Sequence, residues 1–138
     1  MSVYKTELYI CDMEKKIINT SAAPAPIGPY NQATQFGNML FVSGQIPMDP
    51  ATGEIVTSGI QDETRKVLEN VQAILTEAGM DFGHVLKSTI FITDMAQFAQ
   101  INEVYAQFFT ENAPARETVQ VAGLPRGVNV EISVIAAK

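Results

Sequence analysis

Apolar residues recur along this chain with two different spacings, and each spacing predicts a different kind of element. Alternation of apolar and polar residues, or a short run rich in Val and Ile, is typical of strands, whereas recurrence every three to four residues is typical of helices. The predicted order is β-β-α-β-α-β-β. Strands are expected at residues 32–36, 39–43, 85–93, 118–124 and 128–137, and helices at residues 58–78 and 95–109.

The longer predicted helix has the most distinct start and stop signals. It carries one continuous apolar stripe, as expected for a helix that packs one side against a sheet. Ser58 followed by Gln61 resembles a capping box at its start, and Gly79 supplies a stop at its end. Asp94 is expected to cap the second helix.

Turn signals predict that the first two strands and the last two strands form β-hairpins. Gly37-Asn38 joins the first pair, and Pro125-Arg126-Gly127 separates the last pair. In the last strand the even-numbered residues from Val128 to Val134 share one face. The other face then carries Asn129, Glu131 and Ser133.

The connections predict one mixed sheet with both helices on the same face, an α+β architecture. Two helices cover only one face of such a sheet. The strand at residues 85–93 nevertheless has apolar residues on both faces. One predicted face carries Val85, Thr89 and Phe91, and the other carries Leu86, Ile90 and Ile92. An uncovered apolar face is most simply covered by copies of itself, so the pattern predicts a homo-oligomer.

Length and composition predict a single soluble domain. The chain has 138 residues, of which 46% are hydrophobic and 17% charged. Residues 1–16 are interpreted as an N-terminal extension that adds an edge strand or stays loose, ahead of one domain at residues 17–138. No apolar run is long enough for a membrane span, and the N-terminus lacks a signal-peptide pattern, so we expect a cytoplasmic protein.

The charge balance argues against nucleic acid as a partner. With 15 acidic and 9 basic residues the formal net charge is −6, and no cluster of Lys and Arg offsets it. Cys11 and His84 are the only residues of their types, which excludes an intrachain disulfide and metal sites built on Cys or His pairs. Gly-rich phosphate motifs are absent too. Cofactor-free chemistry or simple binding, without a metal, remains.

Arg116 and Glu131 are the first candidates for chemistry. The guanidinium of Arg116 is a planar fork that suits a carboxylate, but the residue is equally consistent with a surface arginine paired with Glu111 or Glu117. Glu131 is the lone carboxylate of the last strand. It either moves protons and orients water, if partly buried, or simply faces solvent.

Three further positions are candidates for binding. Tyr30 follows Gly28-Pro29, a turn that would place its ring over a cleft, although core packing is favoured from sequence. Asn102 interrupts the apolar side of the second helix, either as a satisfied core group or as a ligand contact. Ser43-Gly44 ends a predicted strand, where free backbone N–H groups could bind an anion, or forms an ordinary turn.

Six segments form a recognisable pattern in this order along the chain: residues 25–33, 37–47, 49–54 and 102–105, Pro114-Ala115-Arg116 and Val130-Glu131-Ile132. From about Ile17 onward the chain closely resembles the RidA (YjgF) family, also called the endoribonuclease L-PSP family. The resemblance implies a chorismate-mutase-like α+β fold and a homotrimer with three clefts between subunits.

The resemblance also implies an activity, the hydrolysis of reactive enamines and imines such as 2-aminoacrylate and 2-iminopropanoate to 2-keto acids and ammonia, without a cofactor. By position, Arg116 would bind the substrate carboxylate and Glu131 would activate the attacking water. The backbone at Gly44 and Thr118 would hold that water or the imine nitrogen. The pocket would be shaped by Tyr30, Asn102 and the Ser43 turn.

Two departures from the family pattern bear on substrate choice. Thr118 stands where the family often has Cys, and the segment before Pro114 is a few residues shorter than usual. Two other functions stay open, an endoribonuclease or translation inhibitor and a non-catalytic trimer that binds small carboxylates. The negative charge disfavours the first of these.

Overall fold

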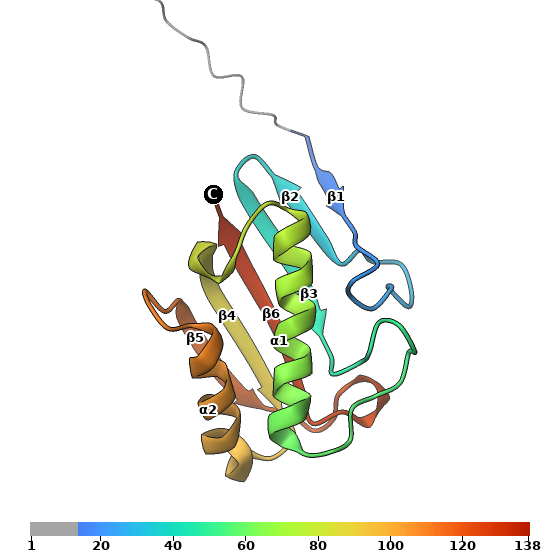
Figure 1. Cartoon of the computed structure of the whole chain (residues 1–138), viewed down its shortest axis with the longest axis vertical. Coiled ribbons are helices and arrows are strands. Elements are labelled where there is room, and N and C mark those ends of the chain that lie inside the picture. The colour runs from blue at the N-terminus through green and yellow to red at the C-terminus, as the bar shows by residue number, and fades with distance from the viewer. Residues whose placement is uncertain (1–13) are drawn as a thin grey trace, which may run out of the picture.

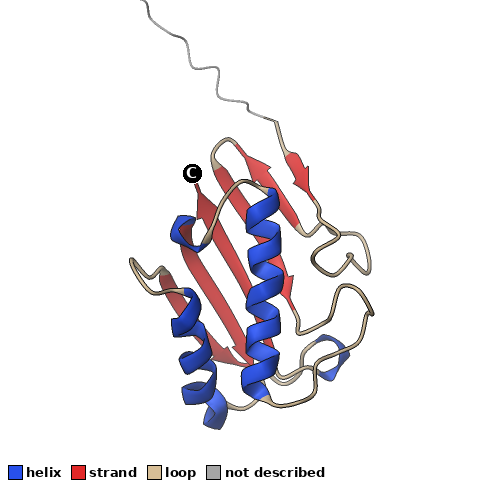
Figure 2. Ribbon diagram, in the orientation of Figure 1, coloured by secondary structure: helices blue, strands red, loops and turns tan. Residues whose placement is uncertain are grey.

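A computed structural model of the chain describes residues 14–138, in which one mixed sheet is covered on one face by two helices (Figures 1 and 2). Cys11 and most of the predicted N-terminal extension lie outside the described residues. The strands are β1 Lys16–Ile18, β2 Ala33–Phe36, β3 Met39–Gln45, β4 Val85–Ile92, β5 Ala115–Gln120 and β6 Val130–Ala137. The helices are α1 Ile60–Glu77 and α2 Phe98–Phe108, with short 3₁₀ turns at Phe82–His84, Met95–Gln97 and Pro125–Gly127.

The strands lie side by side in the order β1-β2-β3-β6-β4-β5. The predicted hairpin of β2 and β3 is confirmed, with Phe36 paired to Met39. The hairpin predicted for the last two strands is wrong, because β6 pairs antiparallel with both β3 and β4 while β5 pairs parallel with β4 (Figure 1). A parallel partner has to arrive through a crossover, and α2 supplies it. The crossover places β5 outside β4 and leaves the interior position to β6.

Helix α1 ends as predicted but begins differently. The predicted capping box is wrong: Gly59 precedes the helix with no side-chain cap, Ser58 Oγ donates to Asp62 Oδ2 at 2.7 Å, and Gln61 Nε2 donates to a carboxylate on α2 at 2.8 Å. At the other end Gly79 has φ 70°, a left-handed conformation that glycine adopts without steric cost. The predicted stop at Gly79 is therefore confirmed.

Asp94, which was expected to cap helix α2, caps the 3₁₀ turn that precedes it. Asp94 accepts a hydrogen bond from the Ala96 N–H at 2.9 Å. The aspartate therefore starts the turn Met95–Gln97, and α2 follows directly after it.

The core lies between the sheet and the two helices. Alternate residues of β6 and one side of α1 are almost fully removed from water. The fully buried aliphatic side chains include Leu68, Ile74 and Leu75 of α1 and Ile90, Ile92 and Ile132 of the sheet. As predicted, the two helices share one face of the sheet and leave the other uncovered (Figure 2).

A β-bulge near the start of β4 changes which of its residues face the helices. The register shifts between Val85 and Lys87. Val85 is therefore buried in the core and Leu86 is 51% exposed. The predicted faces are wrong at these two positions, because strict alternation does not allow for the extra residue of a bulge.

In the described part of the chain, none of the helices combines the length and the apolar character needed to cross a membrane.

Candidate functional site

The sheet places Arg116 and Glu131 on opposite faces of one chain. Arg116 pairs with the buried Ser88 in the parallel β4–β5 ladder, whereas Glu131 pairs with Phe91 in the antiparallel β4–β6 ladder. Paired residues point to the same side, and neighbours along a strand point to opposite sides. Arg116 therefore belongs to the helix-covered face and Glu131 to the open face. The candidate residues form two groups, which a single chain does not bring together.

The first group, the arginine cluster, consists of Arg116, Asn102, Tyr105 and Phe98. Arg116 donates from one terminal nitrogen to Asn102 Oδ1 at 2.8 Å, and its guanidinium carbon lies 4.8 Å from the centre of the Tyr105 ring and 5.6 Å from that of Phe98. Such stacking fixes the plane of a guanidinium and leaves its outer N–H groups available. Within residues 14–138 the Asn102 bond is the one hydrogen bond that Arg116 donates.

The alternative reading of Arg116 as a surface ion-pair partner is wrong. Glu117 binds Lys87 Nζ at 3.2 Å and Thr89 Oγ1 at 3.2 Å on the open face. The arginine cluster instead borders a cavity of about 460 Å³ between α2 and the segment before β5. A half-buried guanidinium at such a cavity is suited to a small carboxylate.

Tyr105 supports the arginine cluster from beneath. Its hydroxyl donates to Ser88 Oγ at 2.9 Å in the core. Burial raises the pKa of Tyr105, while the Ser88 hydrogen bond and the Arg116 charge act in the opposite direction. A neutral tyrosine in contact with Arg116 leaves the positive charge of the guanidinium uncompensated.

Thr118 lies two residues beyond Arg116 on the same face of β5. Its Oγ1 is buried and has no hydrogen-bond partner among the described residues. Its side chain does not reach the Glu131 side of the sheet, because Thr118 pairs with the buried Ile90.

The second group, the glutamate cavity, is a hollow of about 470 Å³ beside Glu131. Of the residues predicted for a single site, four line this cavity together: Tyr30, Ser43, Gly44 and Glu131. Arg116 and Asn102, predicted for the same site, belong to the arginine cluster instead. The full lining is Ile27, Tyr30, Ser43, Gly44, Ile46, Pro125, Arg126 and Glu131. Tyr30 is 50% exposed, so the core packing that was favoured from sequence is wrong.

Gly44 makes room for the Glu131 carboxylate. Ser43 and Gly44 lie inside β3, not beyond its end, at a bulge between Val42 and Gln45. A Cβ atom built on Gly44 would lie 2.8 Å from Glu131 Cδ and nearer still to Oε1. The close approach of this carboxylate to the β3 backbone therefore requires glycine.

Burial raises the pKa of the Glu131 carboxyl above its ordinary value. The side chain is half-buried and has no ion pair or hydrogen bond within the described part of the chain. A carboxylate with a raised pKa and no partner is a better proton acceptor than an ordinary surface glutamate. Glu131 can thus take a proton from a water molecule held in the cavity.

Ser43 holds two backbone segments together, and its hydroxyl group is used for this contact. Its Oγ donates to the Asn31 carbonyl at 2.6 Å, and its N–H donates to the Gln32 carbonyl at 2.9 Å. These bonds hold the segment that carries Tyr30 against β3, which keeps the tyrosine ring at the cavity.

The sequence did not identify the aromatic residues Phe98 and Tyr105 of the arginine cluster as site residues, since they read as part of the apolar side of the second helix. It also did not identify Arg126, which was interpreted only as part of a turn. The turn signal at Pro125-Arg126-Gly127 marked the right place. It could not show that the turn folds back over the cavity beside Glu131.

Known proteins resemble this chain over most of its length. The family model described as Endoribonuclease L-PSP matches residues 20–138. A RutC family protein of Pyrococcus horikoshii is 54% identical, with 90% of this chain and 98% of that protein covered. A mouse protein named 2-iminobutanoate/2-iminopropanoate deaminase is 44% identical, with 90% of this chain and 92% of that protein covered.

A solved structure has the same fold. The crystal structure of Escherichia coli TdcF with bound serine has a TM-score of 0.86 and 52% sequence identity, and the match covers 89% of this chain and 98% of that one. The mixed sheet with two helices on one face is therefore an arrangement shared with that protein.

Proposed function

The chain belongs to the endoribonuclease L-PSP family, the RidA/YjgF family that its motifs resemble, and on this premise we propose that it hydrolyses reactive 2-imino acids to 2-keto acids and ammonia. The substrate class is the small 2-imino acid or its enamine tautomer, such as 2-iminopropanoate and 2-aminoacrylate. The mouse relative carries the name of this activity.

The observation that carries the proposal is the presence of two complementary half-sites on different surfaces of one chain. The arginine cluster offers a carboxylate-binding fork, and the glutamate cavity offers a proton acceptor with a raised pKa. The proposed active site is formed where the arginine cluster of one copy meets the glutamate cavity of the next. A ring of three copies has such head-to-tail interfaces, so the proposed assembly is a homotrimer.

Exposed apolar residues support an interface on the open face. Phe41, Leu86 and Val119 are 45%, 51% and 42% exposed. Together they form part of an apolar surface that water does not favour and a second copy would cover.

The proposed reaction needs positioning and one base. Arg116 binds the carboxylate of the iminium substrate and presents its C2 carbon to a water held by Glu131 of the neighbouring copy. The Glu131 carboxylate takes one proton from the water as the water oxygen bonds to C2, and the C=N double bond becomes a single bond. Glu131 then returns the proton to nitrogen. The C–N bond breaks with its electron pair going to nitrogen, and the C2 hydroxyl group gives its proton to Glu131 and becomes the keto oxygen. The ammonia that leaves takes up this proton from Glu131 as ammonium.

Replacement of Arg116 by Ala tests the activity. The expected loss in kcat/KM for 2-iminopropanoate, generated in place by a serine dehydratase, is about 100-fold or more, because a bidentate charged contact is removed. Arg65→Ala is the matched control, since Arg65 lies on the exposed side of α1 and donates to Gln107 at 2.8 Å. An unchanged rate in the Arg116 variant would overturn the assignment.

Mixing two inactive variants tests the composite site. Arg116→Ala and Glu131→Gln chains are unfolded together and refolded, so that each interface can combine an intact arginine with an intact glutamate. A random mixture should regain about a quarter of the wild-type rate if each site is built from two copies. No recovery is expected if both residues serve the same chain's site.

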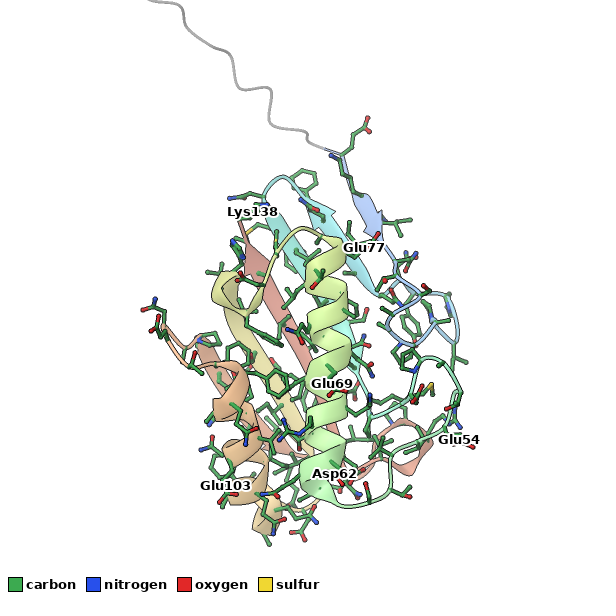
Figure 3. All side chains as sticks on the ribbon, in the orientation of Figure 1. Glu54, Asp62, Glu69, Glu77, Glu103 and Lys138 are labelled. Atoms are coloured by element: carbon green, nitrogen blue, oxygen red, sulfur yellow. The ribbon has the colours of Figure 1, made fainter. Side chains whose placement is uncertain are left out.

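The name of the family favours one alternative, cleavage of RNA. Against it, the outward side of α1 carries Asp62, Glu69 and Glu77, all exposed (Figure 3). Such a surface repels a polyanion. Cleavage of labelled single-stranded RNA by the purified protein, lost in Arg116→Ala, would favour the nuclease over the deaminase.

A further inference from the structure

Arg126 differs from the other arginines of the chain in having no partner. The three arginines, Arg65, Arg116 and Arg126, all lie within the described residues 14–138. Arg65 and Arg116 each donate to a side-chain amide at 2.8 Å, whereas Arg126 has neither a hydrogen bond nor an ion pair with any described residue. Arg126 is one of the residues that line the glutamate cavity. An unpaired cation at a cavity is available to a ligand.

The backbone at Arg126 adopts a conformation that L-residues seldom take. Its φ and ψ are 59° and 19°, and Gly127 follows with φ 69°. The turn is closed by a hydrogen bond from the Gly127 N–H to the Leu124 carbonyl at 3.2 Å. Gly or Asn would fit the left-handed position at lower steric cost, so the presence of Arg there points to a use for its side chain.

The cavity is larger and more apolar than a three-carbon imine requires. Its volume is about 470 Å³, and Ile27, Tyr30, Ile46 and Pro125 supply apolar walls. A cavity of this size accepts a substrate with a longer side chain. Arg126 adds a positive charge to a lining whose other charged residue is Glu131.

Arg126 and Glu131 both line the cavity without pairing with each other. Among residues 14–138 no ion pair or hydrogen bond joins the Arg126 guanidinium to the Glu131 carboxylate. An anion bound by Arg126 would leave Glu131 free to accept a proton from water.

We propose that Arg126 is a specificity-determining residue that binds the side-chain carboxylate of 2-imino dicarboxylates, such as the imine of glutamate. This rests on the proposed deaminase function and names its substrate class. The aliphatic part of such a substrate lies along the apolar walls of the cavity. Its distal carboxylate meets Arg126, and its C2 carbon lies at Glu131.

A pair of substrates that differ only in charge tests the proposal. The imines of glutamate and glutamine are generated in place by amino-acid oxidases, and kcat/KM is measured for each. The wild-type protein should prefer the dicarboxylate, and Arg126→Gln should lower the ratio of the two values by about 10- to 100-fold, as expected for loss of a charge-assisted contact. Arg126→Lys should retain part of the preference, and Arg65→Gln should leave the ratio unchanged.

Two outcomes would overturn the role of Arg126. One is a wild-type protein without preference for the dicarboxylate, and the other is an Arg126→Gln variant that loses activity on both imines to the same extent. If the wild type hydrolyses 2-iminopropanoate but neither of these two imines, the proposed substrate class of Arg126 is wrong and the deaminase function stands. If it hydrolyses none of the three imines, the deaminase proposal itself fails. In either case, calorimetry measures the affinity of wild type and of Arg126→Gln for 2-oxoglutarate and for its amide. Equal affinity of the two proteins for 2-oxoglutarate contradicts the role of Arg126.

Discussion

The two faces of strand β6 carry out different tasks, although their residues alternate along one chain segment. Toward the helices Ile132 is fully buried and Val134 is 2% exposed. Toward the open face Glu131, Ser133 and Ile135 stay half-buried. The covered face supplies apolar burial, and the open face supplies a carboxylate and the surface at which we propose that another copy binds. Because alternate residues of a strand point to opposite faces, the residues of β6 that stabilise the core are different from those available for chemistry.

The same comparison explains why the candidate site is divided. Arg116 points to the helix side because α2 gives its guanidinium two aromatic rings and an amide. Glu131 points to the open side because Gly44 leaves space there. A sheet separates its two faces, so a second copy is the simplest way to bring the two charges together.

The largest expected effect is on the covered face. Ile132→Ala should lower the free energy of unfolding by about 3–5 kcal/mol, because it leaves a cavity in a fully packed core. Ile135→Ala, on the opposite face of the same strand, should cost about 1 kcal/mol or less for the isolated chain. Urea unfolding at two protein concentrations measures both. Equal losses in the two variants would contradict the division of tasks between the faces.

A smaller effect is expected at the bulge of β3. Gly44→Ala should lower kcat by about 10- to 100-fold, because the new methyl group displaces the Glu131 carboxylate from its position. Stability should change by less than about 1 kcal/mol, since the displaced atoms are the flexible end of a side chain. Gly123→Ala is the control, as a Cβ atom there meets nothing within 4 Å. Full activity of Gly44→Ala would show that the carboxylate position is unimportant.

The smallest effect concerns how stability depends on pH. Because burial raises the pKa of Glu131 in the folded chain, its proton is held more tightly there than in the unfolded chain. This contribution is fully present below the unfolded pKa and is lost as pH rises through the folded value. Glu131→Gln should therefore weaken the loss of stability that occurs as the pH rises above the ordinary pKa of a glutamate, about 4.3. Urea midpoints across this range measure it, and identical pH profiles for the two proteins would contradict the buried carboxylate.

Much of the fold was predictable because the spacing of apolar residues along the sequence indicates which side of a helix or strand is buried. The stripe of α1, the β2–β3 hairpin and the alternation of β6 all follow from local spacing and turn residues. Strand pairing was not predictable in the same way. The turn at residues 125–127 is real, but only the crossover by α2 determines that β4 lies between the last two strands.

The sequence identified most residues of the candidate site, but it did not predict how they are arranged in space. Glu131, Tyr30, Ser43 and Gly44 gather at one cavity, and Arg116 binds Asn102 as part of another. Sequence could not show that these groups face opposite ways, because that depends on the register of three strands. The homo-oligomer remains a prediction, supported by the apolar residues of the open face.

The central place of β6 has a consequence for how the chain is made. During synthesis β3 and β4 leave the ribosome well before residues 130–137, and each must wait with one long edge unpaired. Nascent chains that stop short of Val130 would expose both edges to their neighbours. A chain that ends before Val130 should therefore aggregate through the free edges of β3 and β4 and should not yield a shortened folded protein.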